Sequence, residues 1–318
     1  MVVGAVVVEA GAELPVVTMR HPMQIRPLVL ALGLVACATT QPGFPTPEAA
    51  VADLVAAMHA ADMDRIESIL GPGSRDVIDS GDEVADREVW RWFVAAYEEN
   101  HRFEATADGA RVLSIGKDDW PMPIPLVASD GHWRFDTAAG REELISRRIG
   151  RNELDAIEVC LAVVDAQREY AEVDRDGDAI LEYAQKFRSS EGQRDGLYWR
   201  SAEGEPKSPL GEFAARAVRE GYRGADSPQP YHGYYYRILT AQGEHAPGGA
   251  FDYIAHGNMI GGHAIVAYPA EYGVSGVMTF VVNHAGVVYQ KDLGTDTEQR
   301  AEAILVFDPD PSWKRARD

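Results

Sequence analysis

The sequence predicts an α+β protein with two domains. Its length of 318 residues suggests two cores, at about 150 residues per domain. Apolar residues keep helical spacing over residues 46–100 and then give way to short strand-like runs over residues 103–136. A second long helical segment, from residue 153, precedes another strand-rich stretch that ends near residue 291. Helices followed by antiparallel strands, twice over, indicate the α+β class.

Composition and charge limit the partners that we expect. Hydrophobic residues make up 46% of the chain and charged residues 25%, which is ordinary for a globular protein. Acidic residues outnumber basic ones 50 to 30, so the formal net charge is −20. An acidic surface repels phosphate backbones, which argues against nucleic acid as a partner. Two cysteines cannot form a disulfide framework.

The amino terminus has the features of a secretion signal. The apolar run over residues 28–36 is too short to span a bilayer but has the length of a signal-peptide core. Arg20 and Arg26 supply the positive flank before it. We therefore assign residues 1–36 to a signal peptide, in which residues 1–18 read as an over-extended start before Met19 or Met23.

The signal core ends in a pattern typical of bacterial lipoproteins. Leu34-Val35-Ala36-Cys37 resembles a lipobox, in which the cysteine thiol receives the lipid. The alternative is a plain secretory signal with a coincidental cysteine. Lipidation of Cys37 predicts a lipid anchor at the periplasmic face of the cell envelope, and Ala38 after it favours the outer membrane. Residues 37–45 would then form a lipidated tether.

The first domain is expected over residues 46–140. Thr46 and Pro47 mark a helix start, and Asp62 can cap a second helix that ends at Leu70. A third helix is predicted near residues 86–100. Short strands are expected at residues 103–106, 111–115, 123–128 and 133–136, with an Asp130-Gly131 hairpin turn between the last two.

The second domain is expected over residues 153–318, after a basic, helical linker at residues 141–152. Its long helix, to about residue 172, carries Cys160 on an apolar face, where a buried and inert thiol is expected. A short helix holding Tyr183 and Phe187 and a helix over residues 209–220 follow. Strands are predicted at residues 231–240, 251–255, 260–268, 276–283 and 287–291.

These patterns resemble two known architectures. Residues 44–140 are similar to the nuclear transport factor 2-like, cystatin-like cone, which opens with a helix and closes with a strand such as Trp133-Arg-Phe-Asp. The long helix followed by an antiparallel meander resembles the head of type IV pilins and pseudopilins. A pilin helix begins at the mature amino terminus, whereas this helix follows a whole domain.

Several longer motifs resemble one bacterial family, the domain of unknown function 2950. They are Asp118-Asp-Trp-Pro-Met-Pro-Ile-Pro-Leu, Arg148-Ile-Gly-Arg-Asn-Glu-Leu, Asp195-Gly-Leu-Tyr-Trp and Tyr231-His-Gly-Tyr-Tyr. The resemblance covers about residues 44–313 and implies an envelope protein, without implying an activity.

One acidic segment is a candidate metal site. Asp174, Asp176, Asp178 and Glu182 follow the long helix, and calcium favours several oxygen ligands on a tight turn. Ala179 and Gln185 stand where an EF-hand would carry glycine and glutamate, so the segment is not an EF-hand. A shorter Ca2+ turn and a solvated acidic turn both remain open.

Aromatic and histidine side chains supply a candidate ligand surface. Trp120 could line the mouth of the first domain, where proteins of the cone fold bind ligands. Strand alternation places Tyr234 and Tyr236 on one face and Tyr235 on the other. Further candidates are His232, His256, His263, Glu271 and Tyr272. Simple packing of the sheet is the alternative explanation for these residues.

No catalytic motif stands out, so we assign no catalytic residue. Val277 replaces the second glycine of a nucleophile elbow in Gly273-Val-Ser-Gly-Val. We therefore expect a non-catalytic envelope lipoprotein that acts in binding or assembly. The alternatives are a hydrolase of an envelope polymer, built from the histidines and acids of residues 231–289, and an accessory of a type IV pilus or type II secretion-like system.

Overall fold

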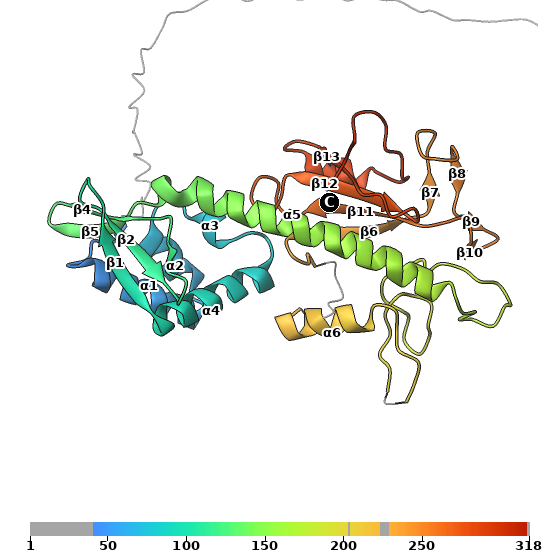
Figure 1. Ribbon diagram of the computed structural model, residues 1–318, viewed down its shortest axis with the longest axis horizontal. Coiled ribbons are helices and arrows are strands. Elements are labelled where there is room, and N and C mark those ends of the chain that lie inside the picture. The colour runs from blue at the N-terminus through green and yellow to red at the C-terminus, as the bar shows by residue number, and fades with distance from the viewer. Residues whose placement is uncertain (1–40, 203, 223–228, 317–318) are drawn as a thin grey trace, which may run out of the picture. The chain divides into compact units, whose positions relative to one another are not determined.

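The computed structural model describes residues 41–202, 204–222 and 229–316 (Figure 1). The expected signal peptide, Cys37 and the first residues of the expected tether lie outside the described residues. The helices and antiparallel sheets of the described chain confirm the α+β class.

Four helices open the described chain, and side-chain caps start three of them. Thr46 caps α1 (Pro47–Ala60), Asp62 caps α2 (Met63–Leu70) and Asp82 caps α4 (Glu83–Glu99), each accepting a backbone N–H in the first turn. The short α3 (Arg75–Ile78) lies between α2 and α4. The first two helices therefore begin as predicted, and α4 begins earlier than predicted because Asp82 is its cap.

The first sheet is antiparallel and packs against these helices. Its strands are β1 (His101–Ala105), β2 (Arg111–Ile115), β3 (Trp120–Pro121), β4 (Leu126–Ser129) and β5 (His132–Phe135). The order is β1-β2-β4-β5, with β3 paired to β2. The predicted turn between β4 and β5 is confirmed, with Asp130 at φ 54° and Gly131 at φ 74°. Leu54, Ile66, Leu113 and Leu126 are fully buried between the helices and this sheet.

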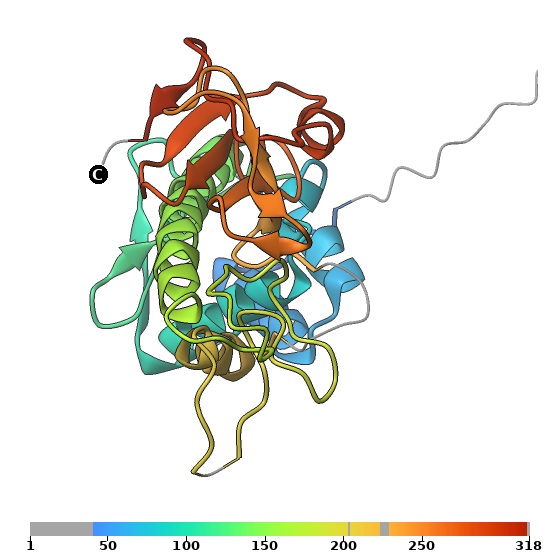
Figure 2. The ribbon, with the colours of Figure 1, turned by 90° about the vertical axis from the view of Figure 1, so that its right-hand side faces the viewer.

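A single long helix connects the first sheet to the second. Helix α5 runs unbroken over Thr137–Tyr170, with Asp136 as its cap. Residues 141–152, expected as a basic helical linker, are helical and lie in the first half of α5, so the linker and the long helix expected from residue 153 are one continuous helix. Figures 1 and 2 show α5 running along the second sheet, with α6 (Gly211–Glu220) on the side of α5 away from that sheet. No helix of the described residues is both long and apolar enough to cross a membrane.

The second sheet is an antiparallel meander, as predicted, but the strand expected at residues 251–255 is not part of it. Its order is β14-β13-β12-β11-β6. The strands are β6 (Tyr234–Leu239), β11 (Ala264–Pro269), β12 (Met278–Asn283), β13 (Tyr289–Asp292) and β14 (Lys314–Arg315). Short pairs at its edge join β7 (Ala241–Gln242) to β8 (Phe251–Asp252) and β9 (Ile254–Ala255) to β10 (Asn258–Met259). Helix α7 (Thr297–Glu302) was not predicted.

Both faces of the second sheet are buried. Ile265 and Phe280 pack with α5 residues such as Val163, whereas Val266 and Val281 face a separate apolar cluster. Cys160 is buried in the α5 cluster, as expected, and burial raises the pKa of its thiol to about 12.

Two local predictions fail for identifiable reasons. Residues 183–187 form no helix, because the Gln167 side-chain amide bonds both the N–H and the C=O of Ala184, each at 2.8 Å. Residues 41–45 are not a free tether. Phe44 pairs with Trp133, and the Gln41 amide donates to the last carbonyls of α2.

Candidate ligand-binding cleft

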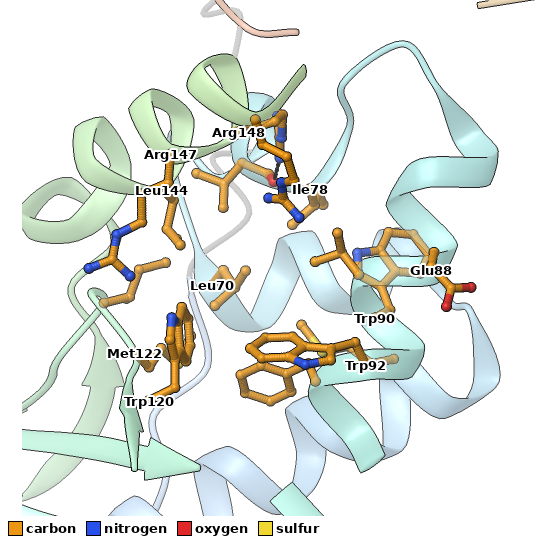
Figure 3. A pocket seen from close by; sticks show the side chains of 16 residues that line it. Leu70, Ile78, Glu88, Trp90, Trp92, Trp120, Met122, Leu144, Arg147 and Arg148 are labelled. Carbon is orange, nitrogen blue, oxygen red and sulfur yellow. Dashed lines mark hydrogen bonds between the residues drawn. The ribbon is translucent and has the colours of Figure 1, made fainter. Parts of the chain in front are cut away.

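A hollow lies where α4, β3 and α5 meet (Figure 3). Its volume of about 610 Å³ is within the range of small-molecule sites. Its lining is mostly apolar and includes three tryptophans, Trp90, Trp92 and Trp120. We call it the tryptophan hollow.

Two of these tryptophans form an exposed aromatic wall. The rings of Trp92 and Trp120 meet edge to face, with centroids 5.3 Å apart and planes at 85°. Trp92 is 47% exposed, whereas Trp90, two residues earlier on α4, is only 4% exposed. Trp92 therefore contributes little to the core and presents its ring to whatever enters the hollow.

Three arginines of α5 face the tryptophans. Leu144, Arg147, Arg148 and Arg151 line the hollow, and their spacing along the helix puts them on one face. The Arg147 guanidinium lies 5.8 Å from the centre of the Trp120 ring. Among the described residues, Arg151 forms no salt bridge. The arginines give this mostly apolar hollow, which Glu88 also lines, a positive side.

The start of α5 is held close to the segment that follows β3. A Cβ on Gly140 would lie 2.4 Å from the carbonyl oxygen of Pro123, so only glycine permits this approach. Met122 and Ile124, on either side of that proline, line the hollow. The close contact between Gly140 and Pro123 therefore fixes the position of the α5 arginines relative to Met122 and Ile124.

Arg148 and Asp86 are the charged groups buried deepest here. Arg148 donates to the carbonyls of Asp76 and Val77, and burial lowers the pKa of its guanidinium. Burial also raises the pKa of Asp86 to about 6, although the Ser80 N–H and the charge of Arg148 oppose that shift.

A second, polar hollow of about 350 Å³ adjoins the first. The two share the lining residues Glu88, Val89, Arg148 and Arg151. Farther from the tryptophans, the polar hollow is lined by Asp155, Glu220, Tyr222 and His232. We call the two hollows together the cleft.

His232 lies between two carboxylates in the polar hollow. Its Nδ1 is 3.0 Å from Asp155 Oδ2 and its Nε2 is 3.3 Å from Glu220 Oε2. Burial alone would lower the pKa of His232, but the two carboxylates hold it above its usual value. Because a carboxylate faces each ring nitrogen, the imidazole is poorly placed to take a proton from a substrate.

Hydrogen bonds of the Asp82 side chain connect the segments that form the polar hollow. One carboxylate oxygen caps α4, and the other accepts hydrogen bonds from the Tyr222 hydroxyl at 2.8 Å and the Gly233 N–H at 2.9 Å. The Tyr222 oxygen in turn accepts the N–H of His232 at 3.2 Å. One buried side chain thus ties the start of α4 to the strand-rich half of the chain.

The other residues expected to form a ligand surface are not brought together. Of the set, Trp120 and His232 line the cleft. Tyr234 and Tyr236 lie on the α5 face of the sheet, which confirms their alternation with Tyr235 but places them in a packed cluster. The remaining candidates are placed elsewhere: His263 is fully buried, His256 is exposed in the turn between β9 and β10, and Glu271 and Tyr272 lie in the loop between β11 and β12.

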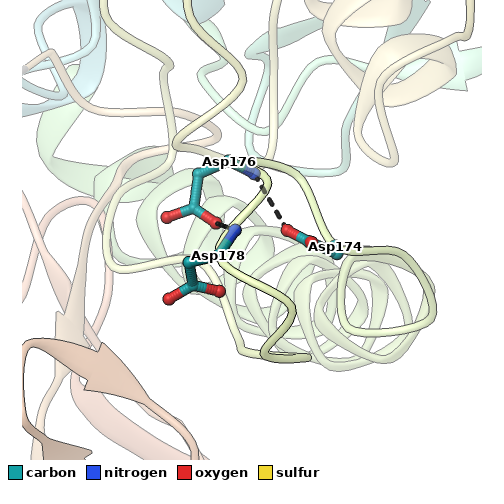
Figure 4. Close-up of side chains that lie close together, drawn as sticks. All are labelled: Asp174, Asp176 and Asp178. Carbon is teal, nitrogen blue, oxygen red and sulfur yellow. Dashed lines mark hydrogen bonds between the residues drawn. The ribbon is translucent and has the colours of Figure 1, made fainter.

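The acidic turn holds three carboxylates close together (Figure 4). Ligand atoms of Asp174, Asp176 and Asp178 lie within 4.8 Å of one another. Backbone amides already occupy Asp174, whose carboxylate accepts the N–H groups of Gly177 at 2.7 Å and Ala179 at 2.9 Å. Glu182 is not part of this group and accepts the N–H of Met259. The geometry fits a solvated acidic turn as well as a Ca2+ turn.

The arginine face of α5 was missed at the sequence level, although its signal is present. The helical spacing i, i+1 and i+4 of Arg147, Arg148 and Arg151 is visible in the sequence, but nothing in the sequence places them in the same hollow as Trp120. Asp155 and Glu220 gave no such signal, because they meet His232 only through the tertiary fold.

Comparison with known proteins identifies the family. Residues 41–316 match the family described as "Protein of unknown function (DUF2950)", so the chain belongs to this family. No curated protein and no solved structure matches the chain.

Proposed function

We propose that this protein is a non-catalytic cell-envelope lipoprotein that binds an amphipathic, anionic ligand in its cleft. One observation carries the proposal: a hollow of about 610 Å³ combines a wall of tryptophans with three arginines on a single helix face. An apolar body would lie against Trp92 and Trp120, and its anionic group would face Arg147, Arg148 and Arg151.

The balance of the lining supports binding of an amphiphile over binding of a purely polar ligand. Apolar side chains such as Met58, Leu70 and Ile124 line the tryptophan hollow from three other segments. Burying an apolar body there removes surface from water at about 25 cal/mol per Å². A guanidinium beside the hollow adds a charge-assisted hydrogen bond to an anion, which fixes the orientation of the ligand.

The envelope location rests on the lipobox-like segment before Cys37, which lies outside the described residues. Replacing Cys37 by serine is expected to move the protein from the membrane fraction to the soluble fraction. Mass analysis of the wild-type amino terminus should then show a lipid-modified cysteine. An unmodified Cys37 in a membrane-bound chain would contradict the lipoprotein assignment.

The cleft is tested by fluorescence with an anionic aromatic probe, 1-anilinonaphthalene-8-sulfonate, and by its displacement with laurate. We expect energy transfer from tryptophan to the bound probe, and loss of that transfer as laurate is added. Trp120→Ala should weaken both ligands about tenfold. Trp313→Ala is the matched control, because Trp313 packs in a separate cluster on the second sheet. Equal binding by the two variants would contradict the proposal.

A further inference from the structure

The charge of the cleft changes sign along its length. Three arginines and one glutamate line the tryptophan hollow. Four carboxylates, two arginines and His232 line the polar hollow. The four carboxylates are Asp86, Glu88, Asp155 and Glu220. A ligand that extends from one hollow into the other therefore passes from a positive to a negative environment.

The change of sign occurs over about one turn of α5. Arg151 lines both hollows, whereas Asp155, four residues later, lines only the polar one. At 1.5 Å per residue the two positions are about 6 Å apart along the helix axis. This spacing suits two opposite charges that are joined by a short link.

The two outer carboxylates are held in place. Asp155 and Glu220 each keep 31% of their side chains exposed. His232 lies between them, the Tyr231 hydroxyl donates to Glu220 at 3.0 Å, and Arg216 forms an ion pair with Glu220 at 3.7 Å, which leaves Asp155 as the carboxylate with no arginine partner among the described residues. Positioned carboxylates that are partly removed from water attract a cation more strongly than mobile surface acids do.

We propose that the natural ligand is a zwitterionic amphiphile. Its apolar chain would occupy the tryptophan hollow, a phosphate would lie against Arg148 and Arg151, and an ammonium on a two-carbon link would reach Asp155 and Glu220. The ligand thus has the chemistry of an ethanolamine phospholipid or of its single-chain form. This inference rests on the proposed function, because it names the ligand class of the same cleft.

The test compares two single-chain lipids with the same lauroyl chain, used below their micelle concentrations. Lauroyl lysophosphatidylethanolamine carries the ammonium, and lauroyl lysophosphatidylglycerol replaces it with a neutral diol. Titration calorimetry with the mature protein should give about tenfold tighter binding of the ethanolamine lipid, as expected for one charge-assisted hydrogen bond.

Variants test the position of the ammonium. Asp155→Asn and Glu220→Gln should each reduce the tenfold preference towards one. Two variants are used because Asp155 also contacts His232, so Asp155→Asn could change the preference by moving His232. Circular dichroism checks that each variant is folded. Glu158→Gln is the matched control: Glu158 is exposed on α5, lines neither hollow and should leave the preference unchanged.

Each other outcome is decisive. Equal affinities of the wild-type protein for the two lipids would contradict the proposal that the ligand is zwitterionic. The proposal that the cleft binds an amphiphile would still hold. The same holds for a preference that survives both Asp155→Asn and Glu220→Gln. If neither lipid binds and laurate does not bind either, the proposed function fails as well.

Discussion

The edge of one indole meets the face of the other where Trp92 and Trp120 come together, at a centroid distance of 5.3 Å. One ring belongs to a helix and the other to a two-residue strand, and Trp92 remains 47% exposed. An exposed indole that is held in position suits a ligand-binding wall.

Trp90 and Trp92 separate the contribution of α4 to stability from its contribution to binding. Trp90→Ala should cost about 3–5 kcal/mol of unfolding free energy, because it empties a core position. Trp92→Ala should cost about 1 kcal/mol, the worth of one aromatic contact, and should weaken laurate binding about tenfold. Urea unfolding and laurate titration check both values. Losses of stability of similar size in the two variants would contradict this division.

The absence of a side chain at Gly140 is predicted to allow the close packing of α5 against Pro123. Gly140→Ala should destabilise the protein by about 1–3 kcal/mol or more, because the added Cβ meets the backbone of Pro123. Gly150→Ala is the matched control on the same helix, where a Cβ meets nothing within 4 Å. It should stabilise the protein by about 0.5–1 kcal/mol through helix propensity. Thermal unfolding of both variants tests the pair, and a harmless Gly140→Ala would refute the close approach.

Asp86 should make the protein less stable as pH rises. Its folded pKa of about 6 lies above the ordinary 3.8, so its contribution to stability is present below pH 3.8 and is lost as pH rises through 6. Asp86→Asn should therefore match the wild type near pH 3.5 and exceed it by about 1–3 kcal/mol at pH 7. Denaturant unfolding across this range is the measurement. A variant that is weaker at every pH would indicate instead that the carboxylate is a needed partner of Arg148.

His263 should have the opposite pH dependence. Burial, with the nearby charges of His284 and Arg168, lowers its pKa to about 3, and neither ring nitrogen has a hydrogen-bond partner among the described residues. The stability that depends on neutral His263 is fully present above pH 6.5 and is lost as pH falls towards 3. Between pH 7 and pH 4 the wild type should lose about 3 kcal/mol more unfolding free energy than His263→Leu does. Acid unfolding tests this, and parallel curves for the two proteins would count against it.

Local sequence signals predicted much of the fold because their causes are local. The caps Thr46 and Asp62 and the Asp130-Gly131 turn each act within a few residues, and each is where the sequence indicated. The meander of the second sheet was also predicted from strand runs and glycine turns.

The parts that were missed depend on contacts between distant segments. Gln167 forms hydrogen bonds with the backbone N–H and C=O of Ala184, where a helix was predicted. The sequence near Ala184 does not indicate this distant partner. His232 meets Asp155 from α5 and Glu220 from the end of α6, so the polar hollow exists only in the folded chain. Trp120 was singled out from its neighbours in the sequence, but the arginines that face it were not.

Photo-crosslinking tests the central claim most directly. The mature protein is irradiated with a fatty acid that carries a diazirine near the end of its chain, and the labelled peptides are mapped by mass spectrometry. We expect the label on the peptides that contain Trp92 and Trp120, and its loss when excess laurate competes. Label spread over the surface and insensitive to laurate would show that the cleft is not the binding site.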